Sequence, residues 1–170
     1  MTHVRYLMLA FAIAGAAPLA GPARAATQNA AVSANVLKPL SLETLQDLDL
    51  GTITLGPGTW SGATMGISRG GTVSCAAAHL ICTGTPRVAR YKVTGSNKQV
   101  VRITAPSVTL VNQADPTKTL TMTVDNPGTV MLTSSGQPGN NFDLGGTITL
   151  SSTTATGDYQ GTFHVTVDYQ

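Results

Sequence analysis

The stretch GDYQGTFHVTVDYQ, residues 157–170, decides the fold class of this 170-residue chain. Its aromatic, aliphatic and glycine positions share one parity: Tyr159, Gly161, Phe163, Val165, Val167 and Tyr169. Polar residues occupy the other parity, and this period of two is that of a β-strand with one buried face. A slip of one residue would place Asp158, His164 and Asp168 in the core. The pattern therefore predicts one uninterrupted terminal strand whose apolar side chains lie in the core, with Tyr169 reaching the surface.

The same period of two continues through most of the chain, and no stretch of a dozen residues keeps helical spacing. A single helical turn is the alternative for residues 43–48. Turn residues such as Asp125, Asn126, Pro127 and Gly128 separate the alternating segments. Short strands are expected near residues 30–36, 48–55, 70–75, 80–85, 89–93, 101–103, 108–110, 119–124, 129–132 and 146–150. Such regular spacing predicts an all-β protein, an antiparallel β-sandwich.

The first 25 residues have the layout of a cleaved signal peptide. Residues 2–5 form a short basic region that contains His3 and Arg5, residues 6–17 form an apolar run, and Ala23, Arg24 and Ala25 form a small-x-small cleavage motif. We expect cleavage between Ala25 and Ala26, which leaves residues 26–170 as a single sandwich domain. The apolar run is shorter than the roughly 20 residues that cross a bilayer, so a membrane anchor is the weaker alternative. Export without a membrane span in the mature chain is the prediction.

The charge of the mature chain argues against polyanionic partners. Removing the signal peptide takes away Arg5 and Arg24, so ten basic residues become eight, against eight acidic ones. A formally neutral chain offers no electrostatic attraction to nucleic acid or to an anionic membrane. Only 11% of the residues are charged, so threonine, serine, asparagine, glutamine and glycine must cover most of the surface. This composition is too rich in β-branched residues for a disordered segment and resembles that of exported β proteins.

Two cysteines lie in the stretch SCAAAHLIC. In an oxidising compartment, Cys75 and Cys82 are expected to form a disulfide across the tip of a hairpin. A loop of about eight residues closed in this way stabilises the fold by roughly 2.5 kcal/mol. The alternative is a metal site made of Cys75, His79 and Cys82, but it lacks a fourth ligand, and a disulfide would consume both thiolates.

The sequence assembles no catalytic set, and we expect neither an enzyme nor a cofactor. The mature chain has two histidines, His79 and His164, and neither has a nucleophile or a base beside it in the sequence. Both are expected to be exposed imidazoles. Asp47 and Asp49 share a strand parity, which is more typical of solvated carboxylates or a weak cation site than of a glycosidase pair.

The single tryptophan marks a candidate binding loop. Trp60 lies in the glycine-rich stretch GPGTWSGATMG, where an exposed indole could stack on a sugar or on an apolar partner. The alternative is that the indole caps one end of a core with few aromatic residues. The two alternatives are left open by the sequence.

Four stretches together resemble the domain-of-unknown-function 4402 family of exported bacterial proteins. They are ANVLKPLSLETLQDLDLGTI, YKVTGSNKQVVRITAPSVTLVN, LTMTVDN and GTITLSSTTATGDYQGTFHVTVDYQ. The closing G-x-Y-x-G-x-F-x-V-x-V-x-Y pattern is the most specific of them. That family is similar to fimbrial subunits and to spore-coat-U-like secreted pilin relatives. The resemblance implies an immunoglobulin-like sandwich that acts as a structural or adhesive protein of the cell surface in a Gram-negative bacterium, passing through its periplasm.

Fimbrial assembly by strand exchange implies particular partners for this chain: identical or related subunits, and a periplasmic chaperone. It also needs an N-terminal strand that completes a neighbour's sheet. Only four residues precede Ala30 in the mature chain, fewer than a strand requires. Either residues 28–37, with Val32, Ala34 and Val36 on one parity, are the donated strand, or the domain is complete and monomeric. In the second case a secreted module would bind a glycan or protein ligand through the Trp60 loop.

Overall fold

The computed structural model describes residues 25–170, so the predicted signal peptide lies outside the described residues apart from Ala25. The chain divides into two units, Met1–Asn35 and Val36–Gln170. Residues 25–35 form neither helix nor strand, and the second unit contains strands and no helix. Within the described residues, no helical segment is suited to crossing a membrane.

The strand predicted for residues 30–36 is not formed. Val32 is 94% exposed and Val36 is 89% exposed. A strand is held by hydrogen bonds to a neighbouring strand, and none of the strands described pairs with these residues. We call residues 28–37 the N-terminal arm.

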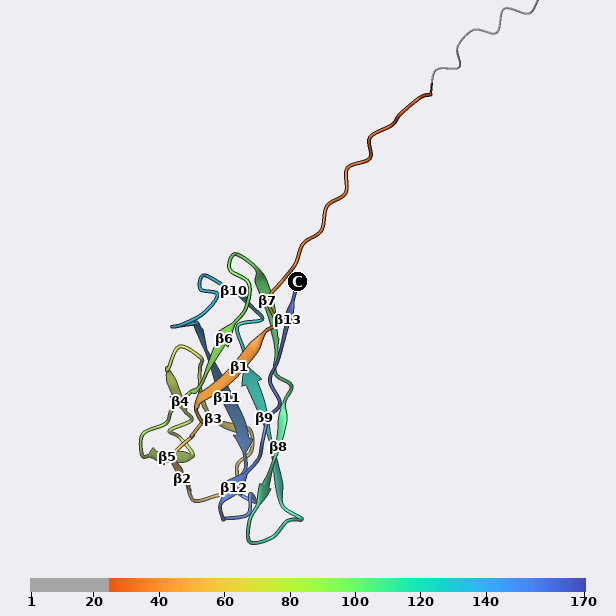
Figure 1. Cartoon of the computed structure of the whole chain (residues 1–170). Coiled ribbons are helices and arrows are strands. Elements are labelled where there is room, and N and C mark those ends of the chain that lie inside the picture. Colours follow the sequence, from red (N-terminus) through yellow and green to blue (C-terminus); the bar gives the residue numbers. More distant parts are fainter. Residues whose placement is uncertain (1–24) are drawn as a thin grey trace, which may run out of the picture. The chain divides into compact units, whose positions relative to one another are not determined.

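The second unit consists of short strands and one long one (Figure 1). They are β1 Ser41–Gln46, β2 Thr52–Leu55, β3 Ala63–Ile67, β4 Val73–Cys75, β5 Leu80–Thr83, β6 Ala89–Thr94, β7 Val100–Thr104, β8 Val108–Asn112, β9 Thr119–Asp125, β10 Thr129–Met131, β11 Asn140–Leu150, β12 Tyr159–Gln160 and β13 Thr166–Tyr169. The helical turn considered for residues 43–48 is wrong, because β1 occupies most of this segment and pairs with β6 from Ser41 to Gln46. The strand β3 was not expected, although Ala63, Met65 and Ile67 alternate as a buried face should.

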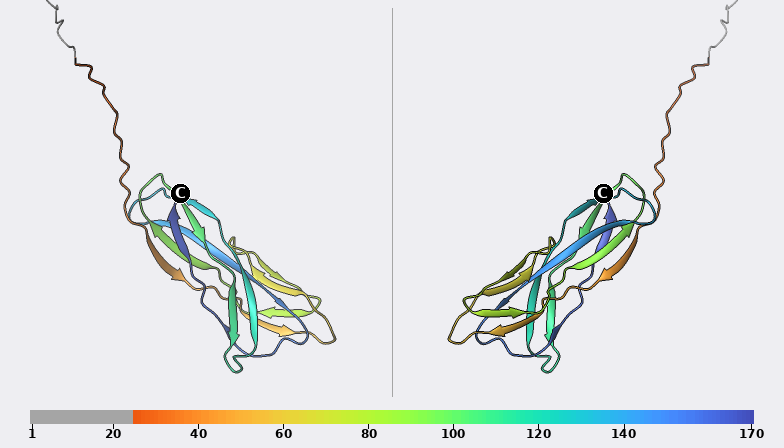
Figure 2. Two further views of the ribbon diagram at one scale, coloured as in Figure 1. Left: turned by 90° about the vertical axis from the view of Figure 1, so that its right-hand side faces the viewer. Right: turned by 90° about the vertical axis from the view of Figure 1, so that its left-hand side faces the viewer.

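All strand pairs are antiparallel, and they form three packed sheets (Figures 1 and 2). The large sheet runs β1-β6-β11-β9-β8-β12, with β3 and β4 joined to it through β11. A second sheet runs β10-β7-β13, and β2 with β5 forms a two-stranded sheet. The arrangement is the all-β antiparallel sandwich that the sequence predicts.

Strand β11 connects the two ends of the sandwich. Its first half pairs with β6, and its second half pairs with β9 and β3. Gly145 lies at the changeover, where a Cβ atom would collide with the carbonyl oxygen of Ile67. Glycine therefore allows β3 to approach β11 closely and then bend away from it.

The C-terminal residues cross from one sheet to another, so the prediction of one uninterrupted strand is wrong. Strand β12 pairs with β8 in the large sheet, whereas β13 pairs with β7 in the three-stranded sheet. Residues 161–165 between them form no strand. The predicted alternation persists, since the apolar parity from Phe163 to Tyr169 is half-buried and the polar parity is exposed. Alternation alone does not reveal that the hydrogen-bonding partner changes midway.

The core consists of two clusters of buried side chains. The β7 cluster comprises Ala89, Tyr91, Val93, Val101, Ile103, Ala105, Leu132, Phe142 and Leu144. The β3 cluster comprises Trp60, Ala63, Met65, Leu80, Val108, Met122, Ile148 and Leu150. Leu48, Val124 and Phe163 are partly buried and pack against both. These three side chains join the clusters into one continuous core.

Candidate functional site

The predicted disulfide is present, but it does not close a hairpin. Cys75 and Cys82 are bonded, with their Cα atoms 6.4 Å apart. Cys75 ends β4, which pairs with β3, and Cys82 lies in β5, which pairs with β2. The bridge therefore ties the large sheet to the two-stranded sheet. Because it uses both sulfur atoms, the alternative metal site is left without its thiolates.

The indole of Trp60 is buried, which agrees with its role as a cap on the core. Its exposed fraction is 8%, and its Nε1 donates a hydrogen bond to the carbonyl oxygen of Gly56 at 3.1 Å. The imidazole of His79 stacks on it, with ring centroids 5.2 Å apart and an angle of 11° between the planes. The ring is therefore not free to stack on a sugar unless the disulfide loop moves.

The other candidate polar residues do not come together as a reactive set. His79 and His164 are both exposed, as predicted. Asp49 accepts a hydrogen bond from the backbone N–H of Gly51 at 2.8 Å and lies 3.9 Å from the guanidinium of Arg87. Within residues 25–170, no group of three or more His, Cys, Asp or Glu side chains is placed to hold a metal ion.

The terminal-strand residues divide between packing and other roles. Phe163, Val165, Val167 and Tyr169 are half-buried and pack against the β7 cluster. Tyr159, expected in the core, belongs to neither cluster. Its hydroxyl donates a hydrogen bond to the carbonyl oxygen of Ala155 at 2.9 Å, and its side chain lines a groove.

Tyr169 fixes the root of the N-terminal arm. Its hydroxyl donates to the carbonyl oxygen of Lys38 and accepts from the backbone N–H of Ser96, both at 2.7 Å. The N–H of Lys38 in turn donates to the Ser96 hydroxyl at 2.7 Å. A side chain at Gly95 would lie 2.5 Å from the tyrosine hydroxyl, so this close contact requires glycine. We call Tyr169, Ser96 and Lys38 the Tyr169 clamp.

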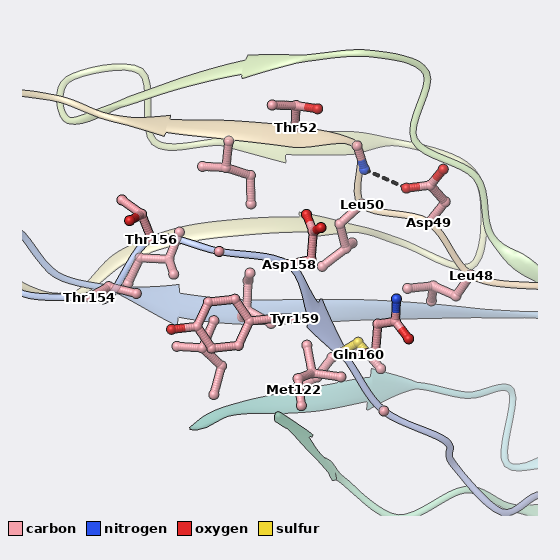
Figure 3. A pocket seen from close by; sticks show the side chains of 18 of the residues that line it. Leu48, Asp49, Leu50, Thr52, Met122, Thr154, Thr156, Asp158, Tyr159 and Gln160 are labelled. Atoms are coloured by element: carbon pink, nitrogen blue, oxygen red, sulfur yellow. Dashed lines mark hydrogen bonds between the residues drawn. The ribbon is translucent and has the colours of Figure 1, made fainter. Parts of the chain in front are cut away.

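A groove of about 1030 Å³ lies between two strands that have no neighbour on one side. One wall is residues 47–55, which include β2, and the other is residues 154–163, which include β12. Within the described residues β2 pairs only with β5, and β12 pairs only with β8. Successive residues of a strand point to opposite faces of its sheet. Because every residue of 47–55 and of 154–163 lines the groove, the groove lies along the edges of these segments and not over one face. We call it the β2–β12 groove (Figure 3).

The floor of the β2–β12 groove is apolar, and its charged lining residues are all acidic. Leu110, Leu120, Met122, Ile148 and Leu150 line it from β8, β9 and β11. Asp47, Asp49 and Asp158 also line it, whereas none of its lining residues is a lysine or an arginine. In Figure 3 the side chains of Leu50 and Asp158 extend into the space between the two walls.

One ionisable group of the groove is perturbed by its position in the core. Burial raises the pKa of the Tyr91 hydroxyl above its ordinary value, and the carboxylate of Asp47 raises it further, while a hydrogen bond with Thr44 acts in the opposite direction. This hydroxyl therefore stays protonated and neutral at physiological pH.

The edges and floor of the groove are complementary to an extended, neutral or basic segment with apolar side chains. Free strand edges offer backbone N–H and C=O groups, and the apolar floor offers hydrophobic contact. Asp47, Asp49 and residues 158–163 of this site stand out in the sequence for other reasons, whereas the leucines, the methionine and the isoleucine of its floor do not stand out as a site. A leucine at an alternate position of a strand is predicted from sequence to lie in the core. The arrangement of the sheets decides which of these leucines face an open groove.

The described fold can be compared with known proteins. A family model described as a domain of unknown function (DUF4402) matches residues 40–169. No curated protein and no solved structure matches the chain. The match covers strands β1 to β13 and leaves the N-terminal arm outside it.

Proposed function

The chain belongs to the DUF4402 family of domains of unknown function, and we propose that it is an exported, non-enzymatic structural or adhesive component of the cell surface. Its role is that of a fimbrial, pilin-like subunit or minor component. It passes through the periplasm of a Gram-negative bacterium with the help of a chaperone and joins identical or related subunits by strand pairing.

The N-terminal arm is the observation that carries this proposal. It alternates apolar residues at Ala30, Val32, Ala34 and Val36, yet it forms no strand, and its two valines are 94% and 89% exposed. Exposure of large apolar side chains to water is unfavourable in free energy. Binding of the segment to a partner would bury these side chains and remove that cost. Strand addition supplies that partner, with backbone hydrogen bonds along the segment and contacts for alternate side chains.

The alternative proposal is a monomeric secreted module that binds a glycan or protein ligand through the Trp60 loop. Burial of the indole at 8% exposure and its stacking on His79 weigh against this use of the loop. A self-complete monomer would also leave the two valines of the arm exposed to water.

The test is to shear the surface fraction from the native host, run it unboiled and boiled on a denaturing gel, and image it by negative stain. A ladder of multimers that collapses to one band on boiling, together with thin filaments, is expected. A host strain lacking this chain is the control and should give neither. A single unboiled monomer band without filaments would overturn the proposal.

A further inference from the structure

We propose that the β2–β12 groove is a strand-acceptor site and that its occupant is the N-terminal arm of a second copy of this chain. The inference rests on the proposed function and adds to it the surface that receives the arm. Three features of the structure support it: the strand edges, the floor and charge of the groove, and the position of the arm's root.

The edges of the groove provide the backbone partners that an added strand needs. Both β2 and β12 are hydrogen-bonded on one side only, within the part of the chain that is described, and both border the groove. Strand β12 is two residues long, and residues 161–165 beyond it form no strand. An inserted strand would complete this edge and cover the apolar floor.

The arm matches the floor and the charge of the groove. Residues 28–37, QNAAVSANVL, carry no charge and place small or medium apolar side chains at alternate positions. One face of such a strand can rest on Leu110 and Leu120, which are half-buried in the absence of a guest. The groove's carboxylates disfavour an acidic guest, and Lys38 at the end of the arm brings a positive charge.

The root of the arm and the acceptor groove lie at different ends of the second unit. The Tyr169 clamp holds Lys38 next to the end of β13, whereas β2 and β12 lie at the far end of the sandwich from the C-terminus (Figures 1 and 2). A contact from one end of a subunit to the opposite end of the next is heterologous and does not close on itself as a two-fold dimer does. Repeated without ring closure, it builds a linear assembly.

The first experiment is amide hydrogen exchange on the exported chain, with the assembled form compared to the monomer. Exchange at residues 52–55 and 158–163 is expected to slow by at least about tenfold in the assembly. The outer edges of β1 and β10 are the internal controls and should exchange equally in both forms. Slowing at β1 or β10 without slowing at β2 and β12 would overturn the inference, as would a monomer in which β2 and β12 are already protected.

A pair of arm variants tests the face of the arm that enters the groove. Val32→Asp places a charge on the apolar parity, and Ser33→Asp places the same charge on the opposite parity. We expect loss of the ladder and of the added protection with Val32→Asp and retention of both with Ser33→Asp. Val32 is 94% exposed, so neither variant should change the unfolding midpoint of the monomer. Equal assembly by the two variants would contradict the proposed insertion.

The two proposals fail in different ways. A ladder with filaments but no protection at β2 and β12 would leave the proposed function standing and remove the groove as the acceptor. If the chain stays monomeric, the proposed function fails, and a synthetic peptide of residues 28–37 added to the full chain then tests the groove alone. Slowed exchange at β2 and β12 on adding the peptide would support the site, and unchanged exchange would overturn it.

Discussion

The hydroxyl of Tyr169 is a single polar group that joins three distant segments of the chain. It links the last strand to Ser96, in the turn after β6, and to Lys38, three positions before the start of β1. The C-terminal end of the N-terminal arm meets the folded unit at Lys38. The clamp therefore anchors the arm to the subunit that would donate it.

Replacing Tyr169 by phenylalanine is expected to lower the free energy of unfolding by about 1 to 2 kcal/mol, because two hydrogen bonds are lost and their partners must find water. Urea unfolding followed by the fluorescence of Trp60, the sole tryptophan, measures the change. Asp168→Asn is the control, since Asp168 is exposed and neighbours the same strand end. A Tyr169→Phe midpoint equal to that of the control would show that the clamp contributes nothing.

Asn140 is a buried amide that organises the turn between β10 and β11. Its Oδ1 accepts hydrogen bonds from the N–H groups of Thr133 and Ser134 and from the Thr133 hydroxyl. Its Nδ2 donates to the carbonyl oxygens of Val93 and Ser134. A single side chain therefore satisfies several groups that would otherwise be left without partners at the end of the sandwich.

Asn140→Ala should cost about 2 to 3 kcal/mol of unfolding free energy, because it leaves these backbone groups without a partner. The adjacent Asn141 is exposed, and Asn141→Ala is expected to stay within about 0.5 kcal/mol of the parent. Chemical denaturation of both variants in parallel gives the comparison. Similar losses for the two asparagines would contradict the role assigned to the buried amide.

The segment between β12 and β13 connects two sheets, because β12 pairs in the large sheet and β13 pairs in the three-stranded sheet. Phe163 lies in this crossing and packs against both the β7 cluster and the β3 cluster. Its neighbour His164 belongs to the polar parity and is exposed. The crossing is therefore held by the packing of Phe163 and Val165 more than by backbone pairing.

Phe163→Ala is expected to destabilise the fold by about 3 kcal/mol, the low end of the range for phenylalanine, because the ring is only partly buried. His164→Ala should change the unfolding free energy by less than about 0.5 kcal/mol. Thermal or urea unfolding of the two variants compares their free energies of unfolding. The comparison distinguishes a loss due to the packing of Phe163 from one that any substitution in this segment would cause. A His164→Ala loss as large as that of Phe163→Ala would mean that the crossing is held by its polar face.

At the scale of the whole molecule, two clusters share one set of bridging side chains. Leu48, Val124 and Phe163 contact both, and β11 runs through both. Neither cluster can therefore lose its packing without exposing side chains of the other, which favours a single cooperative transition.

Cooperative unfolding can be followed with one probe in each cluster. Trp60 fluorescence reports on the β3 cluster, and the aromatic side-chain NMR signals of the stacked Tyr91 and Phe142 report on the β7 cluster. The two probes are expected to give the same midpoint in denaturant. Midpoints that differ beyond experimental error would show that the two ends of the sandwich unfold separately.

The fold class, the disulfide partners and the family could be predicted without a structure, because they follow from local alternation, from cysteine count and from a linear motif. Alternation also identified which side chains of residues 163–169 face inward. It failed at residues 30–36, where a strand pattern has no strand beside it, and at Gly161, where the strand pattern continues but its partner changes.

Which strand edges are left open depends on how the sheets pack in three dimensions. Leu110 and Leu120 look like core residues in sequence, and Asp47 and Asp158 look like solvated carboxylates. The placement of β2 and β12 on opposite walls brings these residues to one groove. Strand pairing is a contact between residues that are distant in sequence. A period-two pattern of apolar residues therefore predicts a strand, but it does not predict whether another strand pairs with each of its edges.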